Sequence, residues 1–239
     1  TAKHSVRTFY ILILTQTLSL IGSRISSLAL GIWVYSQTGS ATPLTLVAFF
    51  AAIPAVFAGS LSGVLADRWD RRYVMIISDA GQAVGTLLLL VSFLSGTFEL
   101  WHLYAVTLIQ SVFSVFQYPA FQASVTMLIP EDQRERANAI QQMTGPMAGI
   151  IAPAIAGVIY AAVGVTGAIM VDLATFLAAA AIIVFIRIPR PAVSAEGEQH
   201  RKSVIGDMLT GLRYFYSKRV LFWVTMQIAL VNFLLGGTF

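Results

Sequence analysis

Three ionisable residues of this sequence lie inside long apolar stretches: Arg24, Asp79 and Asp172. Charge is scarce in the whole chain, since 57% of the 239 residues are hydrophobic and 11% are charged. A carboxyl in apolar surroundings can bind and release a proton or pair with a cation, and a guanidinium can bind an anion. Each of the three is therefore a candidate functional group, with a structural ion pair as the alternative.

Polar side chains also recur at helical spacing in two apolar stretches, and each set shares one helix face. The residues are Gln16, Ser19, Ser23 and Ser26 in the first stretch, and Gln110, Ser114, Gln117 and Phe121 in the second. A surface of amides, hydroxyls and aromatic rings suits an amphiphilic ligand better than a sugar or an anion. We interpret both faces as walls of a cavity; hydrogen bonding between helices is the alternative.

The stretches that carry these residues are long enough to cross a membrane. They lie near residues 8–35, 43–66, 73–95, 101–127, 138–163, 166–187 and 220–239. A helix of about 20 apolar residues spans the hydrocarbon core, and the mean hydropathy is +0.78. The runs are continuous, which excludes the alternating pattern of a membrane β-barrel. The sequence predicts an all-α integral membrane protein.

The basic residues indicate which way the predicted spans run. Of the 15 Lys and Arg residues, all except Arg24 precede the first span or lie at every second connection. Basic connections face the cytoplasm. We therefore expect a cytoplasmic N-terminus in the cell (inner) membrane. The pI of 9.6 reflects this topology and does not indicate nucleic-acid binding.

This topology gives a depth to each intramembrane charge. At 1.5 Å per residue, Arg24 is roughly 24 Å above the inner end of its span, and Asp172 is roughly 10 Å below the outer surface. These depths agree, so we expect Arg24 and Asp172 to pair. In the alternative, Arg24 faces the substrate and Asp172 binds a proton by itself. Asp79 is roughly 10 Å above the inner surface, on a face shared with Gln82 and Thr86.

The densest cluster of charge is the stretch "GVLADRWDRR" at residues 63–72, between the second and third predicted spans. It resembles the signature loop of the major facilitator superfamily, G-x-L-A-D-R-x-G-R-[RK]. Asp70 stands where the pattern has glycine. The resemblance implies that this motif holds the first lobe of a transporter against the second in one conformational state. The residues concerned are Gly63, Asp67, Arg68, Arg71 and Arg72.

The fifth predicted span is similar to the antiporter pattern of that superfamily, with alanine replacing most glycines. The matching small residues include Ala148, Ala152 and Gly157, and Pro153 favours a bend. The tracts "IPEDQRERANAI" and "VDLATFL" look closest to the drug-exporting branch that includes macrolide efflux proteins. Thr107 stands where many proton antiporters carry an arginine.

The resemblance implies the N-terminal half of a twelve-helix transporter. Residues 1–190 would form a six-helix lobe, 191–219 a cytoplasmic linker with an amphipathic interfacial helix, and 220–239 the seventh transmembrane helix; the second lobe is missing. The implied function is alternating-access efflux of amphiphilic small molecules in exchange for protons. A siderophore or lysolipid exporter is one alternative, and a half-size membrane binding or assembly protein is another.

The expected partners are the lipid bilayer, an amphiphilic substrate, protons and the missing C-terminal lobe, with no nucleic acid. We expect no enzyme activity, cofactor or metal. The chain has no cysteine, and His4, His102 and His200 show no metal-ligand spacing.

The distribution of basic residues makes a topological prediction. Cysteines introduced singly at Gln133, Gln199 and Gly39 would be labelled with a membrane-impermeant thiol reagent on intact cells. We expect labelling only of Gly39→Cys, since the other two positions lie in basic connections. Labelling of Gln133→Cys or Gln199→Cys with Gly39→Cys protected would contradict the orientation.

Overall fold

The computed structural model describes residues 2–186 and 216–236, and within these ranges the side chains of 2–5, 59–61, 63–68, 221, 228–230 and 232–236 are not described. The described residues are helical and contain no strand, which confirms the all-α fold. The helices are α1 (Ala2–Thr38), α2 (Thr42–Arg68), α3 (Arg71–Leu94), α4 (Leu100–Leu128), α5 (Arg134–Phe185) and α8 (Arg219–Gly236), with a 3₁₀ turn at Glu131–Gln133.

The chain divides into two compact units, residues 1–191 and residues 192–239. The first contains α1 to α5, and the described part of the second consists mainly of α8. The interfacial helix predicted within 191–219 falls almost entirely outside the described residues.

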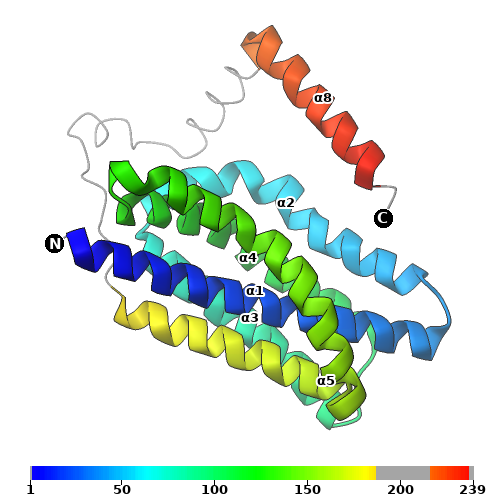
Figure 1. Cartoon of the computed structure of the whole chain (residues 1–239). Helices are drawn as coiled ribbons and strands as arrows, with labels where there is room; N and C mark the ends of the chain where they lie inside the picture. Colours follow the sequence, from blue (N-terminus) through cyan, green and yellow to red (C-terminus); the bar gives the residue numbers. More distant parts are fainter. Residues whose placement is uncertain (1, 187–215, 237–239) are drawn as a thin grey trace. The chain divides into compact units, whose positions relative to one another are not determined.

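Helix α5 consists of two segments that meet at Gly164. This residue has φ 69° and ψ −170°, the only non-helical backbone angles within α5. Figure 1 shows the chain reversing direction within α5, so that the second segment runs back along the bundle. Backbone angles at Pro153 stay helical, so the expected bend is not formed as a break in the helix.

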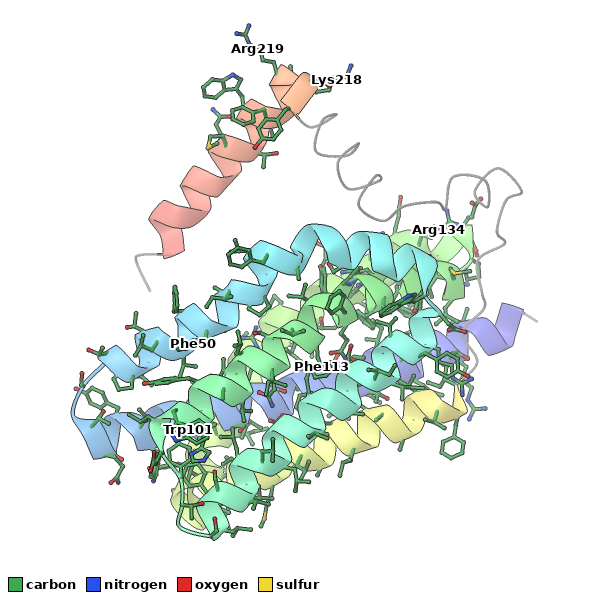
Figure 2. The ribbon with its side chains drawn as sticks, turned by 180° about the vertical axis from the view of Figure 1, so that it is seen from behind. Phe50, Trp101, Phe113, Arg134, Lys218 and Arg219 are labelled. Atoms are coloured by element: carbon green, nitrogen blue, oxygen red, sulfur yellow. The ribbon has the colours of Figure 1, made fainter. Side chains whose placement is uncertain are left out.

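Close packing joins the helices of the first unit. Helix α1 lies against α5, α3 lies against both α4 and α5, and α2 lies against α4 (Figure 1). Small residues permit the approach: a Cβ at Gly22 of α1 would overlap Thr175 of α5, and a Cβ at Gly81 of α3 would overlap the ring of Phe113. Figure 2 shows Phe113 on α4, next to α3. The ring of Phe50 stacks on Tyr104 with centroids 5.4 Å apart, which joins α2 to α4.

The interior has an apolar cluster toward each end of the bundle and polar residues between them. One cluster includes residues from 9–13 of α1 and 74–75 of α3. The other includes residues from 25–34 of α1 and 89–90 of α3. Buried polar side chains lie between these positions, among them Ser19, Asp79, Thr86 and Asp172. The fold therefore encloses these polar groups between the two apolar clusters.

Among the described residues, three helices are long and apolar enough to cross a membrane: Val6–Thr38, Arg71–Leu94 and Glu131–Phe185. The last has 55 residues, about 80 Å of helix, which suffices for one crossing on each side of Gly164. Helix α4 is not among them, because its sequence includes several glutamines and serines that the site described below uses.

The conformation of Gly164 predicts a position-specific cost of adding a side chain. Gly164→Ala should lower the free energy of unfolding by roughly 1–3 kcal/mol, because its backbone region is nearly exclusive to glycine. Gly157→Ala is the control: Gly157 is helical, and no atom would lie within 4 Å of its new Cβ. The midpoint of thermal unfolding in detergent measures both. Equal midpoints for the two variants would contradict the prediction.

Candidate functional site

A cavity of about 670 Å³ lies among α1, α3, α4 and α5. Its volume is in the range of small-molecule sites. Its lining is made of carboxamides, hydroxyls and apolar or aromatic side chains, and no charged side chain of the described residues lines it. The lining residues are Gln16, Thr17, Ser19, Leu20, Ser23, Gln82, Ser114, Gln117, Tyr118, Phe121, Gln122, Asn138, Gln141, Gln142, Thr144, Gly145 and Phe176.

Most residues that the sequence placed on a cavity wall do line this cavity. They are Gln16, Ser19, Ser23, Ser114, Gln117 and Phe121. Two others do not: Ser26 is buried at 4% exposure, and Gln110 donates to Thr86 and to the carbonyl of Gln82. Each stands at one end of its row of polar residues, beyond the positions of its helix that line the cavity.

The wall contributed by the first segment of α5 was missed. It supplies Asn138, Gln141, Gln142 and Thr144. The signal was present in "NAIQQMTG", where amides and a hydroxyl gather at the start of a predicted span. The glycine and alanine pattern of the same helix had indicated helix packing and not a cavity wall.

Asp79 lies behind the cavity wall, with an exposed fraction of 0%. Gln16 donates from Nε2 to Oδ2 of Asp79 at 3.1 Å, and Gln117 donates from Nε2 to Oδ1. Gln117 also donates to Oε1 of Gln16 at 3.1 Å and accepts from Nε2 of Gln82 at 2.6 Å. Both oxygens of the carboxyl group are therefore bound by uncharged donors from two other helices.

Asp172, on the second segment of α5, is the second buried carboxyl group, at 4% exposure. Ser23 donates to its Oδ1 at 2.9 Å, and Thr86 donates to its Oδ2 at 3.0 Å. Gln110 donates to Thr86 at 2.9 Å and to the carbonyl of Gln82 at 3.2 Å. This series of contacts connects Asp172 to the glutamines around Asp79 and thus places both carboxyls in one hydrogen-bonded network.

The predicted pair of Arg24 and Asp172 is wrong. No ion pair joins them, because the oxygens of Asp172 accept from Ser23 and Thr86. Arg24 follows Ser23 on α1 but is exposed, and its Nη1 lies 3.2 Å from where a Cβ of Gly149 would be. The depths that were read from residue counts were compatible, but Arg24 lies beside Gly149 on the first segment of α5, whereas Asp172 is on the second segment and contacts Ser23.

The charged motif makes contacts within the first unit at its described residues. Asp70 accepts from the backbone N–H of Arg72 at 3.1 Å and caps the N-terminus of α3, with φ −66°. A residue with negative φ needs no glycine, which explains the departure from the family pattern. Arg71 donates to the carbonyl of Ala123 on α4 at 3.0 Å.

Arg72 completes these contacts at the end of α5. It donates from Nε to the carbonyl of Ile183 at 3.2 Å and from Nη2 to that of Val184. The last carbonyls of a helix have no partner within the helix. Arg72 binds that of Val184 and is a second donor to that of Ile183, which also accepts from the backbone N–H of Ile186. The side chains at positions 63, 67 and 68, namely Gly63, Asp67 and Arg68, are outside the described set. Their role in holding two lobes together stays a prediction.

The small residues of α5 divide between two faces. Ala148, Ala152 and Ala156 are fully buried or nearly so, and the last two pack in the cluster that contains Ile25 of α1. Pro153 and Gly157 are exposed. The alanines at a spacing of four therefore give α1 its close approach.

Comparison with known proteins gives a family match. The family model described as the Major Facilitator Superfamily matches residues 12–239. The chain is 30% identical over 183 residues to macrolide efflux protein A of Streptococcus pyogenes, which covers 76% of this chain and 45% of that protein. It is 28% identical over 228 residues to the MFS-type transporter YfiS of Bacillus subtilis (strain 168), which covers 94% and 53%. The chain thus spans about half the length of the curated relatives it matches.

The contacts of Asp172 predict which substitutions are coupled. In a double-mutant cycle on stability in detergent, Thr86→Val and Asp172→Asn should be non-additive, by about 0.5–3 kcal/mol, because both act on the hydrogen bond that Thr86 donates to Asp172. The control cycle pairs Arg24→Gln with Asp172→Asn and should be additive to within about 0.5 kcal/mol. Additivity of Thr86→Val with Asp172→Asn, together with coupling between Arg24→Gln and Asp172→Asn, would instead support an ion pair between Arg24 and Asp172.

Proposed function

We propose, since this chain belongs to the Major Facilitator Superfamily, that it forms the substrate-binding half of a secondary active transporter that exports amphiphilic small molecules in exchange for protons. The observation that carries the proposal is the cavity of about 670 Å³ with two buried carboxyl groups connected to its wall. Such a site binds and releases a ligand without covalent chemistry.

The lining of the cavity supports an uncharged or weakly basic amphiphile as the substrate. Carboxamides and hydroxyls supply hydrogen bonds of both kinds, while Leu20, Phe121 and Phe176 supply apolar surface. No basic side chain lines the cavity, so an anionic ligand would find no counter-charge there. Macrolides, which the names of two relatives mention, are large amphiphiles with many hydroxyl groups, and we propose them as a substrate class.

Asp79 and Asp172 support the exchange of substrate for protons. Neither carboxyl group has a cation partner among the described residues, since each is bound by amides or hydroxyls. A proton can therefore bind to either group without breaking an ion pair. Thr107 does not bear on this route, because no contact of Thr107 enters the network that joins the two carboxyls.

The proposed setting is the cell membrane, with the N-terminus and the charged motif on the cytoplasmic side. In this orientation Asp172 and Thr86 lie toward the outer ends of their helices, and Asp79 lies closer to the cytoplasm. The network between them runs along the direction in which a proton has to move.

Transport in everted membrane vesicles tests the proposal. The complete gene product should accumulate erythromycin, a macrolide, in vesicles with an acidic interior. Asp79→Asn should lower the initial rate at least tenfold, a loss of about 1.4 kcal/mol or more in the barrier. Asp132→Asn, an exposed carboxylate in the 3₁₀ turn, is the control and should keep the rate. Accumulation that persists after a protonophore is added would refute proton exchange.

A further inference from the structure

Gln16 and Gln117 separate the carboxyl group of Asp79 from the cavity. Both side chains line the cavity, and both donate to Asp79, which does not line it and is fully buried. A ligand in the cavity therefore contacts the same two carboxamides that bind the carboxyl. Whatever changes the hydrogen bonding of Asp79 also changes the surface that the ligand meets.

The direction of each carboxamide is fixed by its partners. An ionised carboxylate only accepts hydrogen bonds, so both amide Nε2 groups point toward Asp79. Gln117 uses its two N–H groups on Asp79 and Gln16, and its oxygen accepts from Gln82. Gln82 uses its own N–H groups on Gln117 and on the carbonyl of Ser78. The arrangement has no spare donor at Gln82 or Gln117.

A proton on Asp79 is incompatible with this arrangement. A protonated carboxyl has an O–H that must donate, and the atoms that face it are the Nε2 donors of Gln16 and Gln117. One carboxamide has to turn so that its oxygen accepts. If Gln117 turns, its NH₂ group meets the Nε2 donor of Gln82, so that contact breaks as well. The carboxylate had accepted from N–H groups of this carboxamide. After the turn, these N–H groups face the cavity.

We propose that Gln16 and Gln117 are positioning residues that couple the protonation of Asp79 to ligand binding in the cavity. This inference rests on the proposed function. With Asp79 ionised, each glutamine donates one N–H group to the carboxylate. The two carboxamide oxygens each accept once from another glutamine and keep a second lone pair for a donor of the ligand. That wall binds a ligand that donates through hydroxyl or ammonium groups. With Asp79 protonated, released N–H groups face the ligand's own donors and weaken its binding, so that ligand and proton exclude each other.

Other ionisable groups do not intervene at Asp79. Asp172 is reached only through Thr86, Gln110 and the backbone of Gln82. Tyr118 lines the same cavity, where its hydroxyl accepts from Nε2 of Gln122 at 2.8 Å, and Arg24 lies on the exposed side of α1 beside Gly149. The described side chains of α2 include no ionisable group. Every described contact of the Asp79 carboxyl is thus a glutamine.

The test is the pH dependence of erythromycin affinity for the complete gene product in lipid nanodiscs. The wild type should bind erythromycin roughly fivefold or more tightly at pH 8 than at pH 5, which is within the usual range of a coupling between two sites. In Gln16→Met and Gln117→Met, which keep the volume and the carboxyl, this ratio should fall below twofold. Gln142→Met is the matched control, since Gln142 lines the cavity without a contact to the network; it should keep the wild-type ratio even if its affinity drops.

Each outcome separates this inference from the proposed function. Wild-type ratios in both Gln16→Met and Gln117→Met, with monodisperse protein, would overturn the role of the two glutamines and leave proton-driven export intact. A wild-type affinity that does not change with pH, in a protein that still accumulates erythromycin by proton exchange, would also overturn this inference alone. If erythromycin affinity does not depend on pH and the protein does not accumulate erythromycin by proton exchange, both this inference and the proposed function are refuted.

Discussion

Two buried carboxyl groups set the constraint on which the bundle depends. An uncompensated carboxylate in apolar surroundings costs several kcal/mol, so it needs donors that the fold brings to it. Asp79 on α3 obtains them from α1 and α4, and Asp172 on α5 obtains them from α1 and α3. These four contacts fix the longitudinal position of four helices relative to one another, because a shift of one turn would move the donors away from the carboxyls by about 5 Å.

Close helix packing is the condition that allows such short side chains to meet. Serine and threonine reach only a few ångströms, yet Ser23 and Thr86 both reach Asp172. Gly22 lies next to Thr175, in the same region of the interface, and has no room for a Cβ. In a lipid environment, dispersion and hydrogen bonding replace the hydrophobic effect as the attraction between helices. Small residues and the polar network are therefore parts of one interface.

The charged turn before α3 shows how one end of the bundle is held together. Asp70 caps α3, Arg71 binds the backbone of α4, and Arg72 binds the last carbonyls of α5. Positive charge at the C-terminal end of a helix is favourable because the helix dipole is negative there. The arginines of the motif thus stabilise the lobe itself, which is a role separate from any contact of Asp67 with another lobe. A substitution at Arg72 is expected to act on the lobe before it acts on the conformational cycle.

The sequence by itself determined the fold class, the approximate limits of the helices, the charged turn and much of the cavity wall, because apolar length and helical spacing are local properties. It also singled out Asp79 and Asp172, because charge in an apolar stretch needs no partner to be recognised. Only the tertiary structure decided what those carboxyls contact: residue counts placed Arg24 at the depth of Asp172, but the rotation of α1 turns Ser23 inward and Arg24 outward. Hydrogen bonds join residues as far apart as Gln16 and Gln117, and such partners depend on how helices rotate and pack against one another, which no local pattern specifies.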